Sequence, residues 1–330
     1  MDLNELKINS NLKILITGCA GFIGSNLLEF FLKKGLAIKG LDNFSTGSRK
    51  NIDEVLSDVS SSGKNPVFDF IEGDIRDYGK CIEATRDIDI VFHQAALGSV
   101  QRSIENPKDS SEVNIEGTLN LLRASKENGV KRFLYASSSS VYGDTEILPK
   151  VEDMSPNPKS IYAVTKLAAE YYTRLYHKLF GLKTISLRYF NVFGKRQNPD
   201  SIYSAVIPRF IRRINNGLEP EIYGDGNQSR DFTYIDNIVY ANYLAATSEN
   251  NNIFGNFYNI ACSKKISLNE IIDLISELKK IKITPQYLEK RKGDVMHSQA
   301  DIGKARTDLL YSPITFFNEG LINYLGISGL

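Results

Sequence analysis

The feature that most constrains the fold is an apolar run followed by a glycine-rich turn and an amphipathic segment. Residues 13–17, Lys-Ile-Leu-Ile-Thr, have the composition of a buried strand. Gly18, Gly21 and Gly24 follow, and residues 25–34 repeat apolar side chains at helical intervals. A strand, a glycine turn and a helix in this order let the backbone approach a pyrophosphate, which the helix N-terminus stabilises. The glycine spacing is one residue looser than the better-known dinucleotide fingerprint, so an ordinary glycine-rich turn is the alternative at this point.

Acidic residues after the next two predicted strands bear on the nature of the nucleotide. Asp42 ends a strand predicted over 37–41 and lies 18 residues beyond Gly24, about where an acidic group meets the adenosine ribose. A carboxylate there repels a 2′-phosphate, so the sequence predicts NAD rather than NADP. Asp74 follows a strand predicted over 67–71. It can bond the adenine amino group, or it can cap the following helix.

Strands and helices alternate through the first half of the chain, which is typical of a doubly wound parallel α/β (Rossmann) sheet. Further strands are predicted at 90–93, 132–136 and 184–187, and helices at 112–128, from Ser160 onward, at 235–247 and at 268–279. Residues 43–63 are polar and loop-like and receive no assigned role. We expect an NAD-binding domain over 1–190, which also receives about 230–260. A smaller mixed α/β substrate domain is expected mainly over 191–330, interleaved with the first.

Polar residues that could bind a ligand or take part in catalysis follow the predicted strands. Ser137 to Ser140 come directly after the fifth strand, at the edge where an open α/β sheet binds ligands. Tyr162 and Lys166 are four apart, which places them on one helix face with Cβ atoms about 5–6 Å apart. A lysine ammonium beside a phenol lowers the tyrosine pKa, so that the phenol can act as a base near neutral pH. His93 is predicted to be a packed core residue.

Composition excludes several classes of function. The net charge is +1 and no basic run occurs, so a nucleic-acid face is not expected. The sequence contains no stretch of ~18 apolar residues that could span a membrane. The first residues lack the apolar core of a signal peptide. Cys19, Cys81 and Cys262 are far apart and are expected to be reduced thiols of a cytoplasmic protein. The three histidines lack the spacing of metal ligands, so no metal site is expected.

Six segments in this order resemble the extended short-chain dehydrogenase/reductase family, in its nucleotide-sugar epimerase branch. They are Thr17–Gly24, Asp42–Asn43, Asp74–Arg76, Ser137–Gly143, Tyr162–Lys166 and Arg188–Gly194. Segments 93–100, 137–140 and 293–301 are similar to the UDP-N-acetylglucosamine 4-epimerases of the bacterial O-antigen type. Gln101 departs from that pattern, because proline is expected there in the substrate loop.

The resemblance implies three sets of site residues. The catalytic residues would be Tyr162, Lys166 and Ser138. The contacts to NAD would come from Gly18, Gly21, Phe22, Ile23, Gly24, Asp42, Asn43, Asp74, Ile75, Ala95, Ala96, Asn114, Tyr162, Lys166 and Tyr189. The UDP-sugar would contact Ser99, Val100, Ser138, Ser139, Ser140, Asn191, Ile222, Tyr223, Arg230, Arg291, Asp294 and Ser298.

The implied reaction is a redox-neutral C4 epimerisation of a UDP-sugar through a 4-keto intermediate. Ser139 and Ser140 occupy the places where related dehydratases and decarboxylases carry acids, which disfavours those reactions. The resemblance places Ser298 beside the C2 substituent of the sugar, where a small side chain leaves room for an acetamido group. UDP-GlcNAc and UDP-GalNAc are therefore preferred over UDP-Glc and UDP-Gal, and the uronate pair UDP-GlcNAcA and UDP-GalNAcA stays open. A non-catalytic NAD-binding scaffold and a reductase are the rival classes. A homodimer through helices 112–128 and 161–179 is implied as well.

Overall fold

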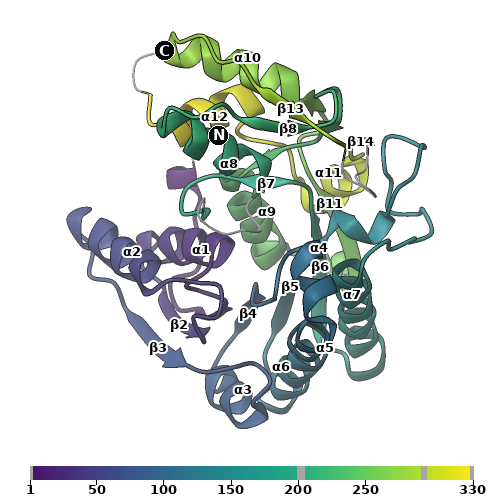
Figure 1. Cartoon of the computed structure of the whole chain (residues 1–330). Coiled ribbons are helices and arrows are strands. Elements are labelled where there is room, and N and C mark those ends of the chain that lie inside the picture. Colours follow the sequence, from purple (N-terminus) through teal and green to yellow (C-terminus); the bar gives the residue numbers. More distant parts are fainter. Residues whose placement is uncertain (1–2, 199–204, 291–295, 328–330) are drawn as a thin grey trace.

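The computed structural model describes residues 3–198, 205–290 and 296–327, and its centre is a seven-stranded parallel sheet (Figure 1). The strand order is β11-β6-β5-β4-β1-β2-β3. The topological switch point of this doubly wound order lies between β1 and β4. The predicted fold class is therefore confirmed. The strands are β1 (Lys13–Thr17), β2 (Ala37–Asp42), β3 (Phe68–Glu72), β4 (Ile90–His93), β5 (Arg132–Ser138), β6 (Lys183–Tyr189) and β11 (Asn256–Ile260).

Helices cover both faces of the sheet (Figure 1). One face packs against α1 (Phe22–Lys33), α2 (Arg49–Ser61) and α9 (Ile235–Thr247). The other packs against α3 (Tyr78–Thr85), α6 (Gly117–Glu127) and α7 (Ile161–Phe180). The short helices α4 (Val100–Glu105) and α5 (Pro107–Ser111) and a π-helical turn, Glu112–Glu116, lead into α6. Each face thus has its own apolar core.

The remaining elements lie mostly beyond the carboxyl edge of the sheet (Figure 1). Three small sheets pair β7 with β10, β8 with β13, and β9 with both β12 and β14. Their bounds are β7 (Val192–Phe193), β8 (Glu221–Tyr223), β9 (Ser229–Arg230), β10 (Thr233–Tyr234), β12 (Ile266–Ser267), β13 (Gln286–Leu288) and β14 (His297–Ser298). The helices are α8 (Val206–Asn215), α10 (Leu268–Lys279), α11 (Gly303–Leu309) and α12 (Phe317–Leu325), and 3₁₀ turns occupy Leu3–Glu5, Ser139–Tyr142 and Asn251–Ile253.

Parts of this architecture differ from the sequence prediction, and α2 and β11 are two of them. Residues 43–63 were expected to be loop-like, but they contain α2, whose Ile52, Val55 and Val59 are buried at helical spacing. β11 was not predicted as a strand, because its two asparagines interrupt the apolar run. The predicted helices at 235–247 and 268–279 are confirmed at their bounds, and Ser160 caps α7 by accepting the Ala163 N–H. The division into two domains stays a prediction.

Cys19, Cys81 and Cys262 are buried and unpaired. In the described ranges no helix is both long and apolar enough to cross a bilayer. The same residues include no group of three or more His, Cys, Asp or Glu side chains placed to hold a metal ion.

A buried ion pair fixes α7 against the sheet. Glu170 Oε1 and Oε2 accept hydrogen bonds from Arg188 Nη2 and Nε of β6, at 2.6 and 2.9 Å. The Ser137 hydroxyl of β5 also donates to Glu170 Oε2, at 2.6 Å. The Arg188 guanidinium lies between the rings of Tyr142 and Phe257, with its central carbon 4.7 and 3.9 Å from their centroids. The side chains of the pair are 1% and 2% exposed, so the charges depend on each other.

Removing the charge of Glu170 should strongly destabilise the fold. We expect Glu170→Gln to lower the free energy of unfolding by about 3–5 kcal/mol, because Arg188 would be left buried without its counter-ion. The measurement is denaturant unfolding followed by circular dichroism. The matched control is Glu127→Gln, which breaks a largely exposed pair with Arg123 on α6 and should change the midpoint little. Equal effects of the two substitutions would contradict the assigned role.

Candidate active site

Three adjoining cavities follow the carboxyl edge of the sheet. The first, of about 40 Å³, lies beside β2 and β3 and is lined by Gly18, Asp42, Asn43, Asp74, Ile75, Ala95 and Ala96 among others. The central cavity, of about 380 Å³, shares Gly18, Thr46 and Ala96 with the first and is also lined by Tyr162, Lys166 and Tyr189. The outer cavity, of about 260 Å³, shares Ala205 with the central one and is lined by Asn191, Tyr223 and Arg230. The predicted residues named here thus line three adjoining cavities.

The glycine turn forms a wall of the first two cavities with its backbone. Gly18 has a φ of +70°, and a Cβ there would lie 2.7 Å from the Ala95 nitrogen. A Cβ at Gly24 would lie 2.0 Å from the Gly18 carbonyl oxygen, so the turn could not close with any larger residue. α1 begins directly after the turn, at Phe22. This cradle fits the pyrophosphate of the predicted NAD, because it offers backbone N–H groups and a helix N-terminus at close range.

Asp42 and Asp74 both lie at the first cavity, but they differ in environment. Asp42 accepts the N–H groups of Ala20 and Phe44 at 2.9 and 2.8 Å. Burial raises the pKa of Asp42, although these N–H groups oppose that shift. Burial acts to raise the pKa of Asp74 too, but hydrogen bonds from Arg76 outweigh it and the pKa is lowered. The interpretation of Asp74 as a helix cap is wrong, because Asp77 caps α3 by accepting the Lys80 N–H.

Tyr162 and Lys166 line the central cavity, and Ser138 lies next to Tyr162. Ser138 is the last residue of β5, and its hydroxyl forms a hydrogen bond with Tyr162. It also accepts a hydrogen bond from the Ser140 hydroxyl, at 2.9 Å. Lys166 is 4% exposed, and its Nζ donates to the Ala136 carbonyl at 2.9 Å. The same Nζ lies 6.0 Å from the centroid of the Tyr162 ring.

The chain's own groups do not lower the pKa of Tyr162, which corrects the sequence prediction. Burial raises the pKa of Tyr162, and the hydrogen bond from Ser138 only partly offsets that rise. Burial also lowers the pKa of Lys166 to about 7, so this ammonium is itself costly to keep charged. The prediction considered only the distance between the two side chains, whereas desolvation dominates both groups.

The start of α7 is held by the loop that follows β4. The Ser103 hydroxyl, which is fully buried on α4, accepts the Tyr162 N–H at 3.0 Å. Asn114 bonds the Leu97 backbone at both its N–H and its C=O, and donates to the Thr165 hydroxyl at 3.0 Å. Asn114 is 1% exposed, so the structure places this predicted cofactor residue behind the cavity wall. The catalytic helix and the loop therefore share one hydrogen-bonded support.

The structure places the remaining predicted substrate residues in different surroundings, some at a cavity and some away from it. Ser99 lines the central cavity and caps α4, and Val100 is the exposed first residue of that helix. Ser139 and Ser140 form the 3₁₀ turn after β5. Ile222 is fully buried and lies outside the cavity lining, next to Tyr223.

Ser298 lies opposite Arg230 in the pairing of β14 with β9 and is 6% exposed. The Asn191 amide donates to the Asp231 carbonyl at 3.0 Å. Arg291 and Asp294 lie outside the described residues. Two residues that are far apart in the sequence, Arg230 and Ser298, are thus brought to one place.

Sequence reasoning missed several cavity residues. The central cavity is also lined by Thr46, Gln94, Arg102, Gln197 and Asn198, and the outer one by Arg209 and Gln228. Gln94 directly follows β4, and Gln197 stands four residues beyond β7. The rule that ligands bind beyond the carboxyl ends of strands could have indicated both. Arg209 lies on a helix that the sequence analysis did not predict, so no signal pointed to it.

Comparison with known proteins agrees with this geometry. Residues 14–261 match the model of the NAD-dependent epimerase/dehydratase family. A putative UDP-glucose 4-epimerase of Methanocaldococcus jannaschii is 35% identical over 310 residues, covering 93% of this chain and 95% of that protein. A UDP-N-acetylglucosamine 4-epimerase from Methanobrevibacter ruminantium, solved with UDP-N-acetylmuramic acid, has a TM-score of 0.88 at 35% identity. A UDP-glucuronic acid 4-epimerase from Bacillus cereus, solved with its substrate and NAD, has a TM-score of 0.85 at 35% identity. Each alignment covers 96% of this chain and 98% of the solved one.

Proposed function

The chain belongs to the NAD-dependent epimerase/dehydratase family, and on that premise we propose that it interconverts UDP-N-acetylglucosamine and UDP-N-acetylgalactosamine. It is a UDP-sugar 4-epimerase with NAD as its cofactor. The observation that supports the finer proposal is the small hydroxyl side chains at two places where the family resemblance expects the sugar. Ser138, Ser139 and Ser140 lie at the end of β5, and Ser298 lies beside Arg230.

The catalytic roles follow from the placement of three side chains. NAD, when bound, supplies the acceptor for the hydride that leaves sugar C4 and later returns it to the opposite face. Tyr162, as phenolate, takes the proton of the 4-hydroxyl and gives it back in the second half of the reaction. Ser138, already bonded to Tyr162, steadies charge on the same sugar oxygen. Lys166 stabilises the phenolate when it is charged.

The sugar must turn between the two half-reactions while its diphosphate stays bound. The outer cavity suits the diphosphate, because Arg230 and Arg209 offer planar guanidinium donors and Asn191 an amide. The tyrosine ring of Tyr223 in the same wall suits a uracil base. Binding at the nucleotide end therefore leaves the hexose free to rotate at the central cavity.

The side chains disfavour dehydration and decarboxylation at this site. Either reaction needs an acid beside the hydroxyl-bearing Ser138, and the next two residues are serines. A uronate substrate is the second candidate, because Arg102 lines the central cavity together with Tyr162. A guanidinium at that position suits a C6 carboxylate. UDP-N-acetylglucosaminuronate is therefore the alternative to test.

The function is tested by Tyr162→Phe together with the wild-type enzyme. The wild type should arrive from purification with NAD bound and convert UDP-GlcNAc to UDP-GalNAc without added cofactor. Tyr162→Phe should lose roughly 100- to 10,000-fold in turnover, because the base is gone, while it keeps its affinity for the UDP-sugar. Product chromatography after separate incubations with UDP-GlcNAc, UDP-Glc and UDP-GlcNAcA identifies the substrate. Near-wild-type turnover in the phenylalanine variant would refute the mechanism.

Ser298 is the proposed specificity residue for the C2 substituent. Ser298→Tyr should reduce kcat/KM for UDP-GlcNAc by about 100-fold or more, because a bulky ring would occupy the space of the acetamido group. Activity on UDP-Glc, which carries only a hydroxyl there, should change far less. Parallel assays with the two sugars measure the ratio, and an equal loss on both would exclude Ser298 as the gate.

We further propose that the chain acts as a homodimer through α7. Val164, Tyr171, Leu175 and Leu179 repeat at helical spacing and are each at least 44% exposed. A second copy of the same helix face would cover this apolar stripe, with α6 alongside. Such a stripe on an otherwise polar surface is typical of a protein contact.

A charge in the middle of the stripe should split the dimer. Leu175→Glu is expected to sediment as a monomer at concentrations where the wild type sediments as a dimer. Val67→Glu, which places the same charge on an exposed apolar residue next to β3, is the control and should stay dimeric. A wild-type protein that sediments as a monomer would overturn the proposal.

A further inference from the structure

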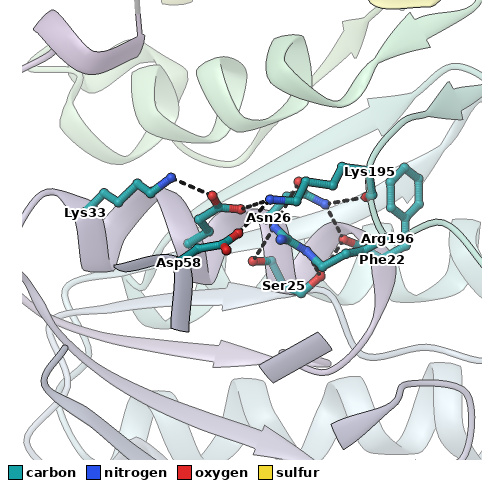
Figure 2. Close-up of polar contacts among 8 residues, drawn as sticks. Phe22, Ser25, Asn26, Lys33, Asp58, Lys195 and Arg196 are labelled. Atoms are coloured by element: carbon teal, nitrogen blue, oxygen red, sulfur yellow. Dashed lines mark hydrogen bonds and ion pairs between the residues drawn. The ribbon is translucent and has the colours of Figure 1, made fainter. Parts of the chain in front are cut away.

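The segment that follows β7 is fastened to the outer side of α1 by two adjacent cations. Lys195 and Arg196 both reach Glu29, which also accepts an ion pair from Lys33 at 2.6 Å (Figure 2). Lys195 Nζ in addition lies 2.9 Å from Asp58 Oδ2 of α2. Burial opposes ionisation of Glu29, but hydrogen bonds from Lys33 and Arg196 lower its pKa to about 2. The carboxylate is therefore charged throughout the neutral range.

Arg196 differs from the two lysines in this network because it is almost fully buried. Its side chain is 2% exposed, whereas those of Lys195 and Lys33 are 49% and 36% exposed. The Arg196 Nε donates to the Ser25 hydroxyl at 3.1 Å, and Nη2 donates to the Asn26 side-chain oxygen at 3.2 Å (Figure 2). Nη2 also donates to the Ser25 carbonyl and to Glu29. Exposed pairs contribute little, so Arg196 is the contact on which the attachment depends.

These contacts join two walls of the central cavity. Ser25 and Asn26 directly follow Phe22, Ile23 and Gly24, which line that cavity on the side of the glycine turn. On the other side, Gln197 and Asn198 directly follow Arg196 and line the same cavity.

Asn26 strengthens the link, because its amide donates both to the Phe22 carbonyl at 2.8 Å and to the Lys195 carbonyl at 2.9 Å (Figure 2). Arg196 itself has a φ of +66°, a conformation that non-glycine residues adopt rarely and that the side-chain contacts hold in place. The segment 194–198 is thus tied to the helix on which the cofactor's pyrophosphate would rest.

We propose that Arg196 is a positioning residue that retains NAD in the site by clamping segment 194–198 onto the first turns of α1. Retention matters for this reaction because it is redox-neutral only over the full cycle. Halfway through, the sugar is a 4-ketone and the cofactor is reduced. If the reduced cofactor leaves at that stage, the ketone is released and the protein is left without its oxidant. The proposal rests on NAD-dependent epimerisation and is independent of which UDP-sugar is turned over.

The test compares three variants of the purified holoenzyme by their rate of NAD loss. Arg196→Met should release bound NAD at least 10-fold faster than the wild type, measured as cofactor remaining on the protein after dilution and gel filtration. Arg196→Lys keeps the charge beside Glu29 but lacks the guanidinium group that bonds Ser25 and Asn26. Its rate of NAD release should therefore lie between those of the wild type and Arg196→Met. Lys33→Met touches the same Glu29 carboxylate without touching segment 194–198, and it should release NAD at the wild-type rate.

A kinetic signature separates retention from a general loss of structure. Turnover of Arg196→Met should depend on added NAD and approach the wild-type kcat at saturating NAD, with some 4-keto sugar trapped by borohydride in the medium. If Arg196→Met does not fold, Asn26→Ala carries the test and should also speed release. It removes the side-chain links to Lys195 and to Arg196, together with one bond to the Phe22 carbonyl within α1.

Wild-type retention of NAD in a folded Arg196→Met, or in Asn26→Ala where that variant stands in, would overturn the proposal. A wild-type enzyme without bound NAD or epimerase activity would instead refute the proposed function.

Discussion

The buried pair between Glu170 and Arg188 sets the position of the catalytic helix, and the site depends on it. Tyr162, Lys166 and Glu170 are spaced by four residues along α7, so they share one face of the helix. Glu170 is held by Arg188 of β6 and by Ser137 of β5, which are opposite each other in the sheet register. Ser137 is the neighbour of Ser138. One carboxylate therefore fixes the depth of α7 against the strand end that carries Ser138, the proposed catalytic serine.

This arrangement explains why the sequence was informative about the catalytic core. Strand β1, the glycine turn and the Tyr162–Lys166 spacing are local patterns, and each has a direct structural consequence that does not depend on distant residues. β1, β4, α9 and α10 were predicted at their bounds for the same reason. Local periodicity and the carboxyl-end rule were sufficient to bring Ser138, Tyr162 and Lys166 to one place.

The features that sequence reasoning missed depend on tertiary contacts. β11 contains Asn259, which is fully buried and satisfied only by partners from elsewhere, including the Tyr142 hydroxyl at 2.7 Å and the Lys150 carbonyl at 3.0 Å. A strand with such a residue has no apolar signature. The direction of the Tyr162 pKa shift likewise depends on burial, which a spacing of four residues does not specify. Arg196 received no prediction, because its burial depends on the fold that places it against α1.

Overall similarity in sequence and fold does not identify the sugar of the substrate. Relatives named for UDP-glucose, UDP-N-acetylglucosamine and UDP-glucuronic acid align with this chain at 35% identity each. All three share the fold with this chain, so the fold alone does not separate the sugars. We propose that discrimination falls to a few side chains around C2 and C6, with Ser298 and Arg102 as the candidates.

The raised pKa of Tyr162 connects catalysis to cofactor retention. The chain's own groups leave the phenol protonated near neutral pH, and burial makes the Lys166 charge costly, with its pKa at about 7. A further positive charge beside Tyr162 would favour the phenolate, and the oxidised nicotinamide of bound NAD would bring one. Loss of the cofactor would then remove both the oxidant and the charge that favours the base. The proposed clamp at Arg196 would hold segment 194–198 on α1, while the buried pair at Glu170 holds α7. Under the proposed mechanism, both helices would have to stay in place for proton transfer.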